Sequence, residues 1–110
     1  MVTLSFDSII VKPMYDREGR KYMDICVPQD VAAHVTKIHE NEQARRTIPI
    51  GNSLWGNVLC VKVPYRYKRV DCDVLGITPV QDMQEADEIS NVIEFSGGWH
   101  TGMFWKFTQI

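Results

Sequence analysis

Long hydrophobic stretches are missing from this sequence. Its longest apolar runs, such as residues 9–11 and 58–61, are only a few residues long, whereas a transmembrane helix needs about 20. The first residues, 1–7, also lack the basic and then apolar layout of a secretory signal. We therefore expect an intracellular protein, cytoplasmic or nuclear, that is complete from Met1 and makes no contact with a membrane.

Cysteine is scarce and is present in an odd number. Cys26, Cys60 and Cys72 are the three thiols, and none has a partner at CxxC spacing. A disulfide framework normally uses an even set in a secreted chain. His34 and His39 are five residues apart, whereas two metal-binding histidines on one helical face are four apart. We expect reduced structural thiols and neither a metal nor a cofactor.

Catalytic motifs are also missing. The sequence contains no nucleophile elbow, phosphate-binding loop or kinase signature. Gly97 and Gly98 are not followed by the lysine and helix start of a phosphate loop. A nucleophilic pair of one cysteine with His100 is the enzymatic alternative that stays open, because such partners are distant in sequence. A non-enzymatic protein is the main expectation.

The composition is that of one compact globular domain covering residues 1–110. Hydrophobic residues make up 45% of the chain and charged residues 24%, which excludes a disordered chain. The net charge of −2 is unevenly placed, because residues 1–70 carry 11 of the 12 Lys and Arg but only 7 of the 14 acids. Such a bipolar molecule either presents a basic surface or stacks head to tail with copies of itself.

The first part of the chain predicts a β-hairpin followed by a helix. Apolar and polar residues alternate over residues 2–7 and again over 21–27, which is the period of half-buried strands. Asp30 is placed as an N-cap. From there, apolar residues at helical spacing predict a helix over residues 31–46 that lies on the surface or plugs one end of a barrel.

The second part predicts two strands, a helix and a closing hairpin. The first strand covers residues 54–70, with an edge or bend at Pro64, and residues 71–75 continue into the second. Thr78 and Pro79 start a helix over residues 79–89. Its acidic side chains form a metal or protein docking surface or a solvated face. Strands at 91–95 and 99–110 then flank a turn at 96–98.

The predicted element order is β-β-α-β-β-α-β-β. It indicates an α+β, β-rich single domain, built as an antiparallel sheet or a small barrel with two helices. The number and order of the strands resemble the five- or six-stranded barrels of the oligonucleotide-binding (OB) type. That resemblance implies an OB-like barrel, but fold likeness does not establish function.

Basic and aromatic residues are interleaved over residues 62–69. On one strand, Lys62, Arg66 and Lys68 would share a face opposite Tyr65 and Tyr67. Cations that follow phosphates, beside rings that stack on bases, are what single-strand binding requires. The alternative is a strand with a solvated basic face and a tyrosine-covered core face.

The C-terminal strand is rich in large rings. Trp99, Trp105 and Phe107 alternate onto one face, with Phe104 on the other. Most of these rings are expected in the core, while an exposed Phe104 could stack on a base or anchor a partner. The alternative is a strand buried on both faces or in a dimer.

We therefore predict a non-enzymatic single-stranded nucleic-acid-binding protein that acts as an oligomer. Its candidate binding residues are Lys62, Tyr65, Arg66, Tyr67, Lys68, Arg69, Arg17, Arg20, Lys21, Trp99 and Phe104. The alternative is a self-assembling or partner-binding structural protein that uses its hydrophobic C-terminal strand.

Overall fold

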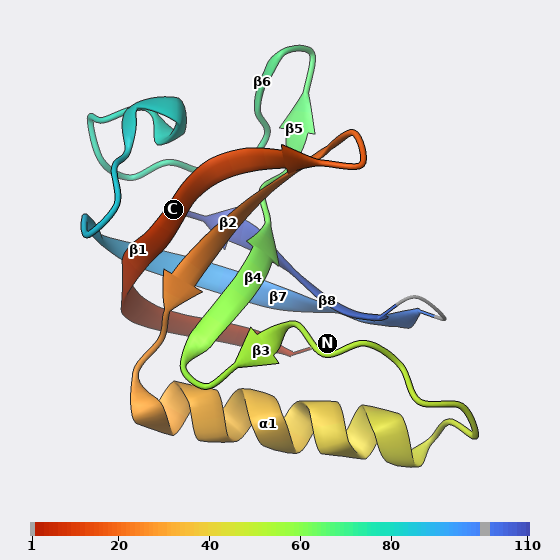
Figure 1. The fold of residues 1–110 in the computed structure, drawn as a ribbon. Coiled ribbons are helices and arrows are strands. Elements are labelled where there is room, and N and C mark those ends of the chain that lie inside the picture. The colour runs from red at the N-terminus through yellow and green to blue at the C-terminus, as the bar shows by residue number, and fades with distance from the viewer. Residues whose placement is uncertain (1, 100–101) are drawn as a thin grey trace.

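The computed structural model describes residues 2–99 and 102–110, except the side chain of Trp99. Its main element is a curved six-stranded sheet in the order β2-β1-β7-β8-β4-β3 (Figure 1). A β-rich domain is therefore confirmed. The strands are β1 (Thr3–Arg17), β2 (Arg20–Cys26), β3 (Leu54–Trp55), β4 (Val58–Lys62), β7 (Glu88–Trp99) and β8 (Gly102–Gln109).

The sheet curls until β2 pairs with β4, but it is not a clean barrel. Strand β2 pairs with β1 along one edge and with β4 along the other. Strands β4 and β8 meet in parallel where Lys62 lies opposite Lys106. That short join is the only parallel pairing among the named strands of the described residues. The other pairings are antiparallel and longer.

Alternation along the strands builds the core. Met23 and Ile25 of β2 lie opposite Val61 and Leu59 of β4, and all four are fully buried. Trp105 of β8 is also buried, beside Ile93 and Phe107. Because every second residue points to the same side of a strand, the residues between them face outward. This outer face of β2 and β4 carries the candidate site.

The described residues form one α-helix, α1 (Gln29–Ala44), which runs beneath the sheet close to β3 (Figure 1). It buries Ala32, Val35 and His39. The predicted N-cap is wrong, because the helix begins one residue before Asp30 and that carboxylate lies in the first turn. There it still faces the positive end of the helix dipole. In the described part of the chain, no helix is long and apolar enough to cross a membrane.

The predicted second helix is wrong, and with it the order β-β-α-β-β-α-β-β. Within residues 79–89 only η1 (Val80–Asp82), a single 3-10 turn, is helical. The backbone N–H of Ala86 donates to the carbonyl of Ile10, and the N–H of Ile10 donates to the carbonyl of Asp87. These hydrogen bonds hold the segment in an extended conformation against β1, and it continues directly into β7. The tertiary contact therefore overrides the helical propensity of residues 79–89.

The continuous strand predicted over residues 54–70 is also wrong. The segment divides into β3, β4 and a separate hairpin of β5 (Tyr65–Arg66) and β6 (Arg69–Val70). The strand ends at Lys62, two residues before Pro64, which has no N–H for a ladder. The turn expected at 96–98 is wrong as well, because β7 continues to Trp99.

Candidate nucleic-acid interface

The β5–β6 hairpin exposes the centre of the basic aromatic segment. Tyr65 pairs with Val70, and Arg66 with Arg69. Tyr67 and Lys68 form the turn, with φ of 55° and 63°, the left-handed values of a tight two-residue hairpin turn. The predicted alternation of bases and rings on two faces is therefore wrong at this turn, and the Tyr67 side chain is 83% exposed.

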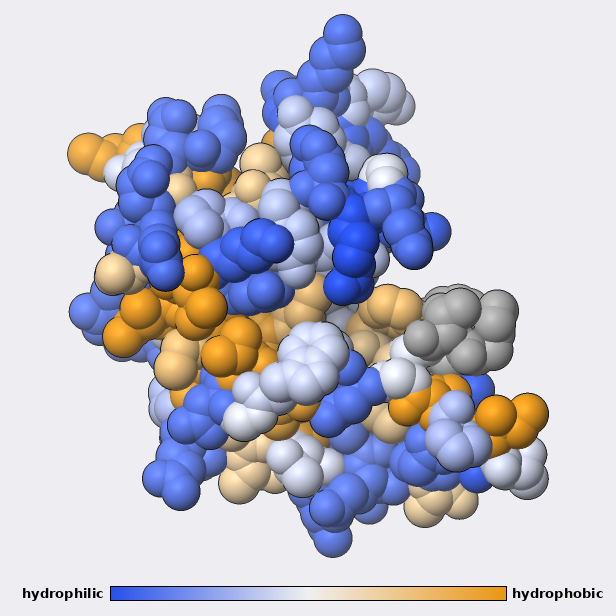
Figure 2. All heavy atoms as spheres, viewed as in Figure 1, coloured by the Kyte–Doolittle hydropathy of each residue, from blue (hydrophilic) through white to orange (hydrophobic). Residues whose placement is uncertain are grey.

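The structure brings this hairpin next to the β1–β2 turn, although some 40 residues separate them in sequence. The ammonium of Lys21 lies 5.0 Å from the centre of the Tyr65 ring. Figure 2 shows hydrophilic side chains gathered over this end of the molecule. A hollow of about 150 Å³ joins the two turns, lined by Gly19, Arg20, Lys21, Lys62, Val63 and Tyr65.

Cations also lie over rings along the outer face of β1 and β2. The guanidinium of Arg17 lies 4.3 Å from the centre of the Tyr22 ring, and the ammonium of Lys12 lies 4.2 Å from that of Tyr15. The two tyrosine rings are 6.1 Å apart. Tyr22 pairs in register with Lys62 of β4. This face therefore continues directly into the hollow between the two turns.

Polar contacts fix the rings of this face. The Tyr15 hydroxyl donates to Oδ1 of Asp24 at 2.7 Å and lies 3.3 Å from Sγ of Cys60. Burial raises the pKa of both the Tyr15 phenol and the Cys60 thiol, so both stay neutral at physiological pH. A neutral thiol is a poor nucleophile. The residues around Cys60 are suited to holding Tyr15 in place.

A cleft of about 200 Å³ lies beside Tyr22, on the same face. Arg17 and Phe104, both predicted from sequence, line it together with Trp55. The Trp55 side chain is 59% exposed. Sequence reasoning missed Trp55, although a tryptophan directly before Gly56 was a usable signal, since a ring at a turn has few neighbours to bury it. Trp55 adds a ring that can stack on a base.

Buried hydrogen bonds support the wall of this cleft. Nε1 of Trp105 donates to Nε2 of His39 at 2.9 Å, so Nδ1 of His39 carries the proton and donates to Oδ1 of Asn52 at 2.8 Å. Asn52 also bonds the backbone N–H and carbonyl of Leu54. Both Trp105 and Asn52 line the cleft. Helix α1 thereby positions the loop that leads into β3, the strand that carries Trp55.

The predicted site residues thus fall into three groups. The two turns bring together Arg20, Lys21, Lys62 and Tyr65, and Arg17 and Phe104 line the adjoining cleft. The remaining predicted side chains of the β5–β6 hairpin are exposed at its tip: Arg66, Tyr67, Lys68 and Arg69. Predictions placed on the Trp99 side chain and on His100 lie outside the described residues.

No known family model, curated protein or solved structure matches this chain. The site must therefore be interpreted from its own chemistry. Within the described residues, no group of three or more His, Cys, Asp or Glu side chains is placed to hold a metal ion. The described cysteines and histidines also form no pair, because His39 bonds Trp105 and Asn52. The features that converge are cations and aromatic rings.

Proposed function

We propose that this protein binds single-stranded nucleic acid without catalysing a reaction. The strand would cross the outer face of β2 and β4, from the β5–β6 hairpin past Tyr22 and Lys62 to the cleft at Trp55. Bases would stack on exposed rings, and Lys and Arg side chains would neutralise the phosphates. Neither interaction reads a particular base, so we expect little sequence preference.

The observation that carries this proposal is the convergence of cation–ring pairs from separate segments. Lys21 with Tyr65 and Arg17 with Tyr22 lie at one end of the sheet, within a continuous outer face. A solvated basic strand would need no such pairing with rings. The Tyr65 ring is 42% exposed, so a base can stack on it beside the Lys21 ammonium, which also pairs with Asp16 at 2.7 Å. The Tyr22 ring is buried and instead holds Arg17 at the edge of the site.

The shape of the sheet supports the same proposal. We interpret strands β1, β2, β4, β8 and β7 as a distorted barrel of the OB type. In such barrels, oligonucleotides bind on the face of the second and third strands and on the loops that connect strands one to two and four to five. The candidate site occupies the corresponding face, on β2 and β4, and includes the β1–β2 turn.

The alternative, assembly through the C-terminal strand, has less support. Met103, Trp105 and Phe107 of β8 are buried within the chain itself. Strand β8 already has β7 on one side and β4 on the other. Its described apolar side chains therefore offer little surface to a second subunit, and the half-buried Phe104 belongs to the cleft.

Salt-dependent oligonucleotide binding tests the proposal. Affinity for a fluorescent single-stranded oligonucleotide should fall steeply as salt rises, because bound phosphates release counterions. The double variant Arg66→Ala/Lys68→Ala should bind more weakly. If both side chains contact phosphates, the slope of log affinity against log salt should shrink by about 1.4, since each contact contributes about 0.7 for a single strand.

The control is Lys37→Ala/Arg45→Ala, which removes one exposed cation from α1 and one from its C-cap. It changes the net charge equally but lies outside the site, so its slope should match that of the unaltered protein. Equal losses in both double variants would show attraction to net charge only. Failure of the unaltered protein to bind at low salt would overturn the proposal.

A further inference from the structure

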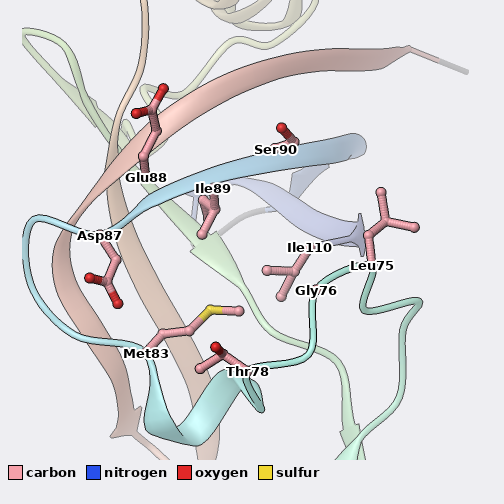
Figure 3. A pocket seen from close by; sticks show the side chains of 9 residues that line it. All are labelled: Leu75, Gly76, Thr78, Met83, Asp87, Glu88, Ile89, Ser90 and Ile110. Carbon is pink, nitrogen blue, oxygen red and sulfur yellow. The ribbon is translucent and has the colours of Figure 1, made fainter.

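A second, larger cavity lies where the segment before β7 meets the C-terminus. Its volume is about 580 Å³. The side chains of Met83, Ile89 and Ile110 converge on it from three segments (Figure 3). These three are themselves buried, so they form an apolar floor. Nothing in the proposed nucleic-acid interface uses this cavity.

The rim of this cavity is acidic and apolar at once. Asp87 and Glu88, at the start of β7, line one side and are exposed, and the Glu88 side chain points away from Met83, Ile89 and Ile110 (Figure 3). Leu75 lines the cavity too and is 66% exposed, and its neighbour Ile77 is fully exposed at 101%. No ion pair of the described residues involves Asp87 or Glu88. The cavity therefore suits a ligand with an apolar body and positive charge.

The β5–β6 hairpin has that chemistry. Tyr67 presents an exposed ring at its tip, between Arg66 and Lys68. No ion pair in the described part of the chain uses these two cations or Arg69. The hairpin projects away from the sheet (Figure 1). A tyrosine ring fits an apolar floor while its hydroxyl reaches the polar rim.

We propose that the cavity receives the β5–β6 hairpin of a second copy of this chain. The Tyr67 ring would enter between Met83, Ile89 and Ile110, and the flanking cations would face Asp87. Because donor and acceptor are different surfaces, the contact is head to tail and can continue from copy to copy. The hairpin is part of the proposed nucleic-acid site, but assembly requires no nucleic acid.

Sedimentation analysis without nucleic acid tests this proposal. At low salt the average mass of the unaltered protein should rise with its concentration and fall again when salt screens the charges. The cavity variant Leu75→Ser/Asp87→Asn and the hairpin variant Tyr67→Ser should each self-associate at least about tenfold more weakly. All three positions are exposed, so these variants should fold.

A matched control is Ile48→Ser/Glu40→Gln, which removes one exposed apolar side chain and one exposed acid elsewhere. It should associate like the unaltered protein. Mixing the cavity variant with the hairpin variant should restore a dimer, because the first keeps an intact hairpin and the second an intact cavity. A symmetric contact elsewhere on the surface would not produce this rescue.

Two results would overturn the proposal: an unaltered protein that stays monomeric at low salt, or a cavity variant that assembles normally. The proposed function is judged separately. The cavity variant should keep the affinity of the unaltered protein for a short oligonucleotide, because the hairpin and the cleft are unchanged. Loss of assembly with intact oligonucleotide binding in the cavity variant thus supports both proposals. An unaltered protein that assembles but binds no oligonucleotide overturns only the proposed function, and one that binds oligonucleotide but stays monomeric overturns only the head-to-tail assembly.

Discussion

Individual rings on the outer face of β2 are held by contacts on both sides. Tyr22 is packed against Arg17 and Tyr15, and the Tyr15 hydroxyl is bonded to Asp24. Trp55, in contrast, has most of its surface open. Tyr22 is only 6% exposed, so it fixes the shape of this face and offers little surface to a base. Trp55 is the ring of this face that is open to stacking.

Trp55→Ala should weaken oligonucleotide binding with little effect on stability. Loss of one stacked base costs about 1–3 kcal/mol, or roughly 5- to 150-fold in affinity. The exposed ring contributes little to the core, so the midpoint of denaturant unfolding should barely move. Fluorescence anisotropy and guanidinium unfolding measure the two effects.

The control is Ile48→Ala, which removes another exposed apolar side chain and should bind like the unaltered protein. If Trp55→Ala binds with the affinity of the unaltered protein, Trp55 is not part of the site.

His39 should make the fold sensitive to mild acid. Burial lowers the pKa of His39 below its usual 6.5, an effect that its hydrogen bond with Asn52 partly opposes. The unfolded chain therefore takes up a proton near pH 6.5 while the folded chain does not. The free energy of unfolding should fall as the pH drops below 6.5 towards the folded-state pKa, by at most about 1.4 kcal/mol per pH unit.

Guanidinium unfolding between pH 7.5 and 5 measures this dependence. His39→Gln should show a smaller loss of stability on acidification, because it has no imidazole to protonate. His34 is exposed on the same helix, so His34→Gln should retain the acid sensitivity of the unaltered protein. If His39→Gln and His34→Gln show the same pH dependence, the His39 bonds to Trp105 and Asn52 do not govern it.

Strand β8 illustrates how a secondary-structure element contributes beyond its own residues. It lies between β7 and β4 and supplies Trp105 and Phe107, each only 1% exposed. It also supplies Phe104 to the cleft. Without β8, both β4 and β7 would present an unpaired edge, which is a template for aggregation. The strand thus supports the core and the candidate site together.

A chain that ends at Gly98 should not fold. Burial of even three of the lost apolar side chains contributes on the order of 5–8 kcal/mol, comparable with the whole stability of a small domain. Circular dichroism melting and size-exclusion chromatography should show a non-cooperative or aggregated species. A soluble, cooperatively melting shortened chain would mean that β8 is dispensable to the core.

At the scale of the whole molecule, the uneven charge has a structural counterpart. The basic first part of the sequence supplies the β5–β6 hairpin and the β1–β2 turn, while the acidic last part supplies the rim at Asp87 and Glu88. One hairpin serves both proposed contacts, with nucleic acid and with a second copy. Two ligands that use the same surface must exclude each other.

Saturating amounts of a short oligonucleotide should therefore dissociate the assembly. Sedimentation should show the mass of one chain with one oligonucleotide, because hairpins occupied by nucleic acid cannot enter a neighbouring cavity. The control is triphosphate at equal ionic strength, a polyanion too short to cover the hairpin. It should leave the assembly largely intact. Assemblies that persist with oligonucleotide bound to every chain would show that the hairpin is not shared.

Local patterns in the sequence determined the β-rich class and the pairing of the first two strands. Alternation over residues 21–27 places Met23 and Ile25 inward whatever the rest of the chain does, because successive side chains on a strand point to opposite sides. The interleaved Lys, Arg and Tyr residues of the β5–β6 hairpin can also be recognised from the sequence alone. Their arrangement as a hairpin cannot.

Only the tertiary structure decided what happens where distant segments meet. Residues 79–89 begin with residues typical of a helix start, but their backbone pairs with β1 instead. The N–H of Ala86 donates to the carbonyl of Ile10, and the N–H of Ile10 donates to the carbonyl of Asp87, although these residues are far apart in sequence. The contact of Lys21 with Tyr65 and the placing of Trp55 beside Phe104 also depend on the curl of the sheet. Local propensities differ by less than about 1 kcal/mol per residue for most amino acids, so a few such long-range contacts outweigh them.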